Sequence, residues 1–209
     1  MYEVETKVRA DHEAIREFVG ALGAEFRGTI EQEDTYYDAP HRSLGETDEA
    51  LRVRRETIVE TAGDAETGGH DGPGEAPEND DEERNTERTV LTYKGPLVDG
   101  ESKTRREVET VVENATAIRE LLLALGFESA AAVSKTRSIY AAAEGEWTLV
   151  CDRVEGLGEF VEVELEAEAE DIDAARERVR RVLRDLDVDP EAGIRASYLE
   201  MLLDEDDRA

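Results

Sequence analysis

Lysine and cysteine are both scarce in this chain of 209 residues. Only four of its 25 basic residues are lysine, and its single cysteine, Cys151, excludes an intrachain disulfide. No apolar run is long enough to span a membrane, and no signal peptide precedes the first expected strand, which begins almost at residue 1. We therefore expect a soluble, cytoplasmic protein.

Positive charge as a whole is in short supply. Aspartate and glutamate number 54 against 25 lysines and arginines, which gives a net charge of −29. Such a surface repels nucleic acids and anionic membranes, so neither is expected as a partner. An acidic excess also suits a protein kept soluble in high salt, which predicts a halophilic protein. In a chain this poor in lysine, Lys7, Lys94 and Lys135 are favoured as functional residues, although chance alone can also have left them.

The chain also lacks the motifs of two large classes of enzyme. It shows no Ser/His/Asp or Cys/His arrangement and no glycine-rich phosphate-binding loop, which disfavours nucleophilic catalysis and P-loop chemistry. What it has instead is glutamate alternating with apolar residues. From Glu162 to Glu170 every second residue is glutamate, and shorter forms of the pattern stand at 3–7 and 107–110. Since a strand points alternate side chains to opposite faces, each stretch predicts a strand with one apolar face and one face of carboxylates.

A helical pattern follows each of these three strands, and part of the chain is repeated. AIREFVGALG, from Ala14, and AIRELLLALG, from Ala117, are copies of one helix, with Asp11 and Asn114 as the expected N-caps. A third helix is expected after residue 170, and a short final helix begins near Tyr198. The expected strands are 2–9, 27–38, 50–59, 88–95, 103–112, 133–143, 147–154 and 160–170.

We predict one domain over residues 1–204, because the glutamate strands span both ends of the chain. Residues 61–88 are acidic, rich in glycine and almost free of apolar residues, so they are expected to be a disordered insertion within that domain. Residues 205–209 are expected to be a frayed acidic tail.

The fold class follows from how strands and helices cover one another. The helices are amphipathic and need an apolar surface to pack on. If they pack outside the sheet, the charged strand faces turn inward, and an eight-stranded, mostly antiparallel sheet closes into a barrel with a charged tunnel. We predict this α+β architecture. The alternative is an open sheet with helices on one side and a wet charged face on the other, which the periodicity alone does not exclude.

The expected tunnel carries both signs of charge. Carboxylates bind hard divalent cations such as Mg²⁺ or Mn²⁺, whereas arginine and lysine bind phosphate oxygens. Arg52 and Arg54 share one strand face and form a possible fork for phosphate, although for these two alone an ordinary solvent-facing strand fits as well. The basic side chains expected on the charged strand faces are those of Lys7, Arg52, Arg54, Lys94, Lys135 and Arg137.

Several motifs, taken in order, make the sequence resemble the CYTH superfamily, the triphosphate tunnel enzymes. The resemblance covers nearly the whole chain apart from the acidic insertion and tail. The motifs are Glu3-x-Glu5-x-Lys7, Asp34-Thr35-Tyr36-Tyr37-Asp38, Leu51-Arg52-Val53-Arg54, Leu91-Thr92-Tyr93-Lys94-Gly95, Lys135-x-Arg137, and Asp152-Arg153-Val154-Glu155-Gly156-Leu157-Gly158 leading to Glu162-Val163-Glu164.

The resemblance implies roles for individual residues. It implies that Glu3, Glu5, Asp152, Glu162 and Glu164 bind the catalytic metal, Mg²⁺ or Mn²⁺. It also implies that Lys7, Arg52, Arg54, Lys94, Lys135 and Arg137 bind the triphosphate and stabilise its charge during the reaction. Arg105, on the face of Glu107 and Glu109, joins the substrate-binding set, and these two glutamates are expected to line the tunnel.

The activity implied by the resemblance is metal-dependent chemistry on a small-molecule triphosphate. The sequence looks most like a class IV adenylate cyclase, which converts ATP to cyclic AMP and pyrophosphate. The alternative is a triphosphatase that hydrolyses inorganic, thiamine or nucleoside triphosphate at the same site. A non-enzymatic module that binds polyphosphate or a nucleotide is the third hypothesis, and a full set of metal ligands argues against it. The chain is expected to be a monomer or a homodimer.

Overall fold

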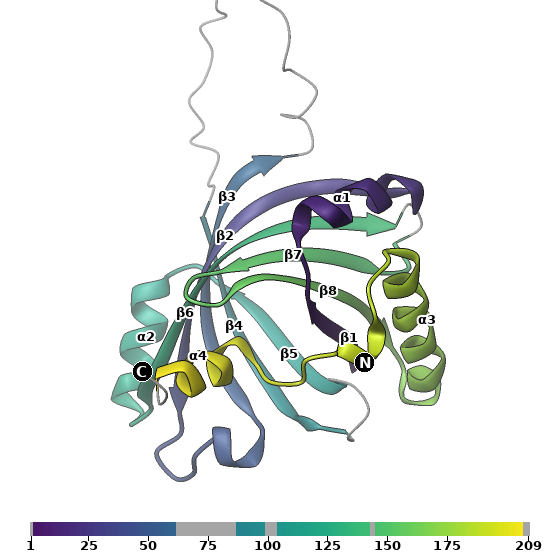
Figure 1. Ribbon diagram of the computed structural model, residues 1–209. Helices are drawn as coiled ribbons and strands as arrows, with labels where there is room; N and C mark the ends of the chain where they lie inside the picture. The colour runs from purple at the N-terminus through teal and green to yellow at the C-terminus, as the bar shows by residue number, and fades with distance from the viewer. Residues whose placement is uncertain (1, 62–86, 99–103, 143–144, 207–209) are drawn as a thin grey trace, which may run out of the picture.

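Eight antiparallel strands form a closed barrel in the computed structural model, which describes residues 2–61, 87–98, 104–142 and 145–206 (Figure 1). Their order around the barrel is β1-β5-β4-β3-β2-β6-β7-β8. The strands are β1 (Tyr2–Arg9), β2 (Ala24–Asp38), β3 (Ala50–Thr61), β4 (Glu87–Leu97), β5 (Arg105–Val112), β6 (Glu128–Ala142), β7 (Thr148–Val154) and β8 (Gly158–Ala167). The closed barrel of the sequence prediction is thereby confirmed over the open sheet.

The helices lie on the outside of the barrel (Figure 1). They are α1 (His12–Ala21), α2 (Ala115–Ala124), α3 (Ile172–Asp185) and α4 (Tyr198–Asp206). The two predicted N-caps are confirmed, because the side chain of Asp11 accepts from the backbone N–H groups of Glu13 and Ala14, and that of Asn114 accepts from Ala117. No helix among the described residues has the length and apolar character to cross a membrane.

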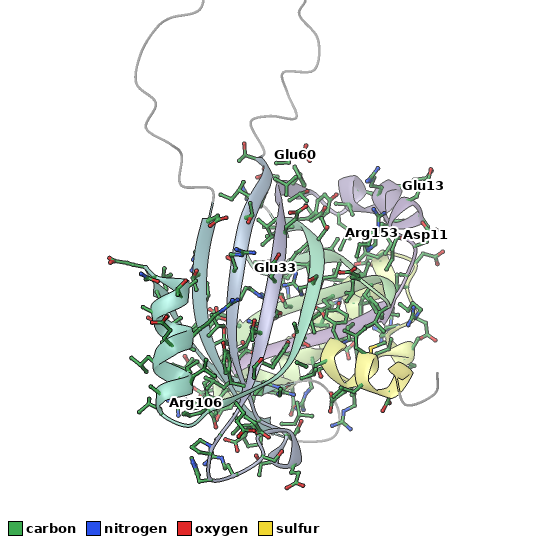
Figure 2. The ribbon with its side chains drawn as sticks, turned by 90° about the vertical axis from the view of Figure 1, so that its left-hand side faces the viewer. Asp11, Glu13, Glu33, Glu60, Arg106 and Arg153 are labelled. Atoms are coloured by element: carbon green, nitrogen blue, oxygen red, sulfur yellow. The ribbon has the colours of Figure 1, made fainter. Side chains whose placement is uncertain are left out.

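The apolar core lies between the barrel and the helices, which explains why the charged strand faces turn inward. Val4 of β1 and Val161 and Val163 of β8 are fully buried and belong to one cluster with Val179 and Leu183 of α3. Burying these side chains stabilises the fold by roughly 1.5–3 kcal/mol each. Because the residues between them on each strand must then point the other way, Glu3, Glu5 and Lys7 of β1 and Glu162 and Glu164 of β8 face the barrel interior. Figure 2 labels residues of the outer surface instead, such as Glu33 on β2 and Arg106 on β5, which are both exposed.

The barrel has one weak seam, between β1 and β5. β1 pairs with β8 along its whole length, from Tyr2 to Arg9, whereas among the described residues its register with β5 consists of the single pair Glu3–Arg105. Further along β1, the segment after α3 takes over, since the backbone N–H of Ile194 donates to the carbonyl oxygen of Lys7 at 2.7 Å. The chain near its C-terminal end therefore completes this side of the barrel.

Several element boundaries differ from the sequence prediction. β4 continues through Gly95 and Pro96, because a register shift against β5 between Lys94 and Leu97 accommodates a proline that has no N–H to donate. β8 ends at Ala167, and a 3₁₀ turn follows at Ala169–Asp171. Glu168 and Glu170 therefore do not continue the strand.

The predicted acidic insertion is shorter at both ends than expected. β3 runs to Thr61 and β4 starts at Glu87, so these residues and Arg88 belong to paired strands. Residues 62–86 lie outside the described residues, and the predicted disorder there stays a prediction. The limits of the domain and of the tail also stay predictions, although α4 continues to Asp206.

Because it has no side chain, Gly28 of β2 lets β2 and β3 approach closely near a point where the register between them shifts. Its φ is +153°, and a Cβ placed there would lie 2.7 Å from the carbonyl oxygen of Glu60. We expect Gly28→Ala to lower the free energy of unfolding by roughly 1–3 kcal/mol, because both the backbone conformation and the close approach are lost. Urea unfolding monitored by circular dichroism measures this. Gly20→Ala on α1, where a Cβ meets nothing within 4 Å, is the matched control and is expected to stabilise by roughly 0.5–1 kcal/mol. Equal effects of the two substitutions would contradict this account.

Candidate active site

A cavity of about 260 Å³ inside the barrel brings the predicted site residues together. Every residue that the sequence analysis proposed for the site lines this cavity, except Asp152. The residues come from β1, β3, β4, β5, β6 and β8, and only the closure of the barrel brings them within reach of one another. The walls carry both an acidic cluster and cationic side chains.

The acidic cluster consists of Glu5, Glu162 and Glu164. Glu5 of β1 stands directly opposite Glu164 of β8 in the strand register, and Glu162 is the next inward residue of β8. One carboxylate oxygen from each lies within 4.8 Å of the others. Three converging carboxylates are suited to a hard divalent cation, which takes oxygen ligands. Among the predicted metal ligands in the described chain, these three are the ones that the fold places as a compact set.

The crowding of these carboxylates shows in their acid–base properties. Burial, together with the charges of Glu162 and Glu5, raises the pKa of Glu164 from its ordinary 4.5 to about 7, even though Arg137 acts to lower it. Burial also raises the pKa of Glu3 well above its usual range, with Glu5, Glu107 and Glu164 adding to the effect and Lys94 opposing it. A divalent cation bound here would relieve this repulsion, so the donor set fits such an ion.

The raised pKa of Glu164 predicts how stability depends on pH in the metal-free protein. Because the folded-state pKa lies above the unfolded one, the stability linked to this group is fully present below pH 4.5 and is lost as the pH rises through about 7. Glu164→Gln is therefore expected to match the wild type near pH 5. At pH 8 it should be more stable by on the order of 1–2 kcal/mol, discounted because the side chain is partly exposed.

Thermal unfolding in EDTA between pH 5 and 8.5 measures this difference. Glu166→Gln is the control, because Glu166 belongs to the same strand but is exposed. Parallel pH profiles for the wild type and Glu164→Gln would contradict the prediction.

Two arginines of β3 form the first part of the cationic wall. Asp34 of β2, only 3% exposed, accepts from Arg54 Nε at 2.6 Å and Nη2 at 2.8 Å, and Arg52 Nη1 lies 3.5 Å away. Burial acts to raise the pKa of Asp34, but the two guanidinium groups outweigh it and hold this pKa well below its usual range. The other guanidinium nitrogen of Arg52, Nη2, donates to Thr92 Oγ1 at 3.1 Å. Asp34 thus fixes both arginines with their edges toward the cavity.

Lys135 and Arg137 of β6 form the second part of that wall, around Asp152. Arg137 donates to both carboxylate oxygens of Asp152 at 2.7 and 2.6 Å, and Lys135 donates to Oδ2 at 2.8 Å. The hydroxyl of Tyr198 donates to the same oxygen at 3.0 Å. Asp152 is fully buried behind the cavity wall, and donors occupy both its oxygens. In this arrangement Asp152 positions Lys135 and Arg137, and its metal-ligand role stays a prediction.

The pKa values of Lys135 and Arg137 are shifted in opposite directions. Burial, together with the neighbouring charge of Arg137, lowers the pKa of Lys135 to about 8, although Asp152 opposes this. Burial acts in the same direction on Arg137, but Asp152 and Glu162 outweigh it and raise its pKa above the usual range. Arg137 also donates to Glu162 Oε2 at 2.8 Å and so links the cationic wall to the acidic cluster.

The remaining predicted residues lie toward β4 and β5. Lys94 Nζ donates a hydrogen bond to Glu107 Oε1 and lies 3.6 Å from Glu3 Oε1. Glu109 accepts from Thr92 Oγ1 at 2.7 Å, in line with its predicted place on the tunnel lining. Arg105 pairs with Asp48, its Nη2 lying 3.7 Å from that carboxylate.

Asp34, Thr92 and Tyr198 are site residues to which the sequence analysis gave no role. Lys7 Nζ donates to the carbonyl oxygen of Ala196 at 2.5 Å and lies 4.0 Å from the centre of the Tyr198 ring, while Lys135 Nζ lies 5.0 Å from it. A ring face attracts both ammonium groups. Two features of the sequence could have pointed to these residues. Asp34 precedes Thr35-Tyr36 in an expected strand, and Tyr198 begins the last helix, but neither feature specifies which side chain the residue contacts.

Comparisons with known proteins agree with this picture. The family model of the CYTH domain matches residues 1–198. A protein from Methanocaldococcus jannaschii, whose name assigns it provisionally as an adenylate cyclase, is 34% identical over 203 residues, which is 96% of this chain and 98% of that protein. The solved structure of the PH1819 protein from Pyrococcus horikoshii OT3 has a TM-score of 0.77 at 36% identity and covers 97% of this chain and 99% of that chain.

A plant protein shares the fold at a greater distance. A structure from Hippeastrum, provisionally called an adenylyl cyclase and described as having a dominant triphosphatase activity, gives a TM-score of 0.56 at 17% identity. It covers 90% of this chain and 88% of that chain.

Proposed function

The chain belongs to the CYTH domain family, and from this membership we propose that it is a metal-dependent enzyme acting on a triphosphate held inside the barrel. The observation that carries the proposal is the division of one cavity into an acidic cluster and a cationic wall. A triphosphate is a flexible anion that needs cations along its length, and arginine and lysine side chains supply them. A cavity that bound anions alone would not be built with three converging carboxylates.

Glu5, Glu162 and Glu164 would hold the metal ion, Mg²⁺ or Mn²⁺. When bound, such an ion supplies positive charge next to the phosphates and lowers the pKa of an attacking hydroxyl group. Arg52, Arg54, Lys135 and Arg137 would bind the phosphate oxygens from β3 and β6, and Lys7 and Lys94 would do so from β1 and β4. Asp34 and Asp152 hold four of these cations in place, so their donors are oriented before the substrate arrives.

The reaction that we propose is the cyclisation of ATP. The ribose 3′-hydroxyl oxygen bonds to the α-phosphorus as its proton is released to water. The bond from that phosphorus to the oxygen that bridges it to the β-phosphorus breaks, and pyrophosphate leaves with the electron pair. The cationic wall stabilises the negative charge that grows on the leaving pyrophosphate. Support for this reaction over others comes from the Methanocaldococcus relative, whose name assigns it provisionally as an adenylate cyclase.

Hydrolysis of a triphosphate is the second candidate, and the cavity lining favours it. Of the residues that line the cavity, nearly all are charged or polar, and the larger apolar or aromatic ones are Tyr36, Tyr198 and Leu199. Tyr198 already contacts two lysines, so little surface is left on which an adenine ring could stack. In this reaction water attacks the terminal phosphorus, the bond from that phosphorus to the bridging oxygen breaks, and orthophosphate is released while the diphosphate part of the substrate leaves with the electron pair.

A product assay tests the proposal. Purified protein is incubated with ATP and, separately, with inorganic triphosphate, each with Mg²⁺ or Mn²⁺ and with EDTA as the control, and the products are separated by chromatography. Cyclic AMP together with pyrophosphate is the expected result. Orthophosphate without a cyclic product would replace cyclisation by hydrolysis. Turnover in EDTA would contradict the metal dependence, and tight binding without turnover would leave a binding module. The predicted cytoplasmic location and halophilic character stay predictions based on composition and charge.

A further inference from the structure

A second cavity, of about 110 Å³, lies at the weak seam beside β1. Its walls come from three parts of the chain: β1, helix α3, and the segment at 190–195 that follows α3. Glu5 and Lys7 of β1 line both this side cavity and the main one. The two cavities therefore share these two residues.

The side cavity reverses the charge balance of the chain. Lys7, Arg176, Arg180 and Arg195 line it, against Glu5 and Glu191. The whole chain has 54 acidic and 25 basic residues, so a cavity with twice as many cations as anions is a marked local exception. The arginines come from a helix and from a separate segment, so it is the tertiary fold that gathers them.

Arg176 and Arg180 are one helical turn apart on α3 and differ in burial and in their hydrogen-bond partners. Arg176 is 8% exposed and donates to Asp173 at 3.0 Å. Arg180 is half-buried, and in the part of the chain that the structure describes it forms no hydrogen bond or ion pair. A guanidinium group has five N–H donors and cannot lose its charge, so partial burial without an acceptor is unfavourable. An anion in the cavity would supply the missing acceptors.

We propose that the side cavity is a second oxyanion site, which binds inorganic phosphate or pyrophosphate through Arg180 with Arg176 and Arg195. Guanidinium groups recognise the tetrahedral oxygens of phosphate with paired hydrogen bonds, and the cavity is small enough to favour a compact anion over a nucleotide. Its position against Glu5 and Lys7 places the bound anion beside the main cavity. That the anion is a product of the enzyme rests on the proposed function, whereas the anion site itself does not.

Isothermal titration calorimetry of the full chain with pyrophosphate and with inorganic phosphate, in EDTA, tests the proposal. The wild type is expected to show an anion-binding event whose affinity Arg180→Gln weakens at least about tenfold, because a charged donor pair is lost. Arg181→Gln is the matched control, since Arg181 is exposed on the same helix and loses the same charge. Arg180→Lys, which keeps the charge but not the paired donors, should bind with intermediate affinity.

The possible outcomes separate this proposal from the proposed function. Loss of binding in Arg180→Gln, with unfolding unchanged and with Arg181→Gln unaffected, supports the side cavity even if the product assay finds no turnover. Equal affinity in the wild type and Arg180→Gln overturns it. Equal loss in Arg180→Gln and Arg181→Gln also overturns it, because that result reports only the net charge of the helix. Binding that Lys94→Gln abolishes and Arg180→Gln leaves unchanged assigns the anion to the main cavity instead.

Discussion

Glu162→Gln is expected to lower metal-dependent turnover by about a hundredfold or more while leaving the protein folded. Glu162 is 4% exposed, lies in the acidic cluster and accepts from Arg137 at 2.8 Å. Mutating a residue that only hydrogen-bonds to a metal ligand commonly lowers metal affinity or activity ~10–100-fold. Removing a ligand itself is therefore expected to lower activity by more. The fold does not need this charge, because Arg137 keeps both its bonds to Asp152.

The measurement is turnover as a function of Mn²⁺ or Mg²⁺ concentration, with the free energy of unfolding measured in parallel. A ligand role predicts that the metal concentration needed for half-maximal turnover rises, and Glu5→Gln should behave in the same way. Glu166→Gln makes the same chemical change at an exposed position of β8 and should leave turnover and metal dependence unchanged. If Glu5→Gln and Glu162→Gln both kept full activity, the acidic cluster would not be the metal site.

The inward orientation of the glutamates could be predicted from sequence for a definite reason. On β1 and from Val161 onward in β8, apolar residues largely alternate with charged ones, and amphipathic helices follow that need those apolar faces. Val4 and Val161 could therefore pack only outward against helices, which forces Glu5 and Glu162 into the barrel. The same alternation led us to predict that β8 ends three residues too late, at 170, because Glu168 and Glu170 continue the pattern beyond Ala167, where the strand ends.

The groups that hold the cations in place could not be predicted in this way. Asp34 meets Arg54 only because β2 and β3 pair in the register that sets them opposite each other, and alternation within one strand does not specify a register. Tyr198 reaches Asp152 from a segment 46 residues away in sequence. The contacts of Asp152 could not be predicted for the same reason, because its motif indicates a carboxylate near the site but not that Lys135 and Arg137 donate to its oxygens.

Asp34→Asn is expected to lower the free energy of unfolding by roughly 3–5 kcal/mol, the largest effect on stability that we predict. The substitution removes the negative charge that two buried guanidinium groups share, and an uncompensated buried charge carries a cost of this size. Glu33→Gln is the control, one residue along β2. Glu33 and Arg55 form an ion pair of which both side chains are about half exposed, at 55% and 43%, so its loss should cost roughly 0–1 kcal/mol. Glu33 faces outward in Figure 2, and the two substitutions thus compare the two sides of one strand.

The pH dependence of this difference separates charge from packing. The folded-state pKa of Asp34 lies well below its ordinary 3.8, so its stabilising contribution is present above that pH and is lost as the pH falls further through the folded-state value. Urea unfolding at pH 7 should therefore show the full gap between the wild type and Asp34→Asn, and the gap should narrow as the pH is lowered below about 4. If the difference in free energy of unfolding stayed constant down to the lowest pH, asparagine would destabilise the protein through its packing and not through the loss of charge. Asp34 would then fill space in the barrel wall, and the arginines facing the substrate would be held by something other than its charge.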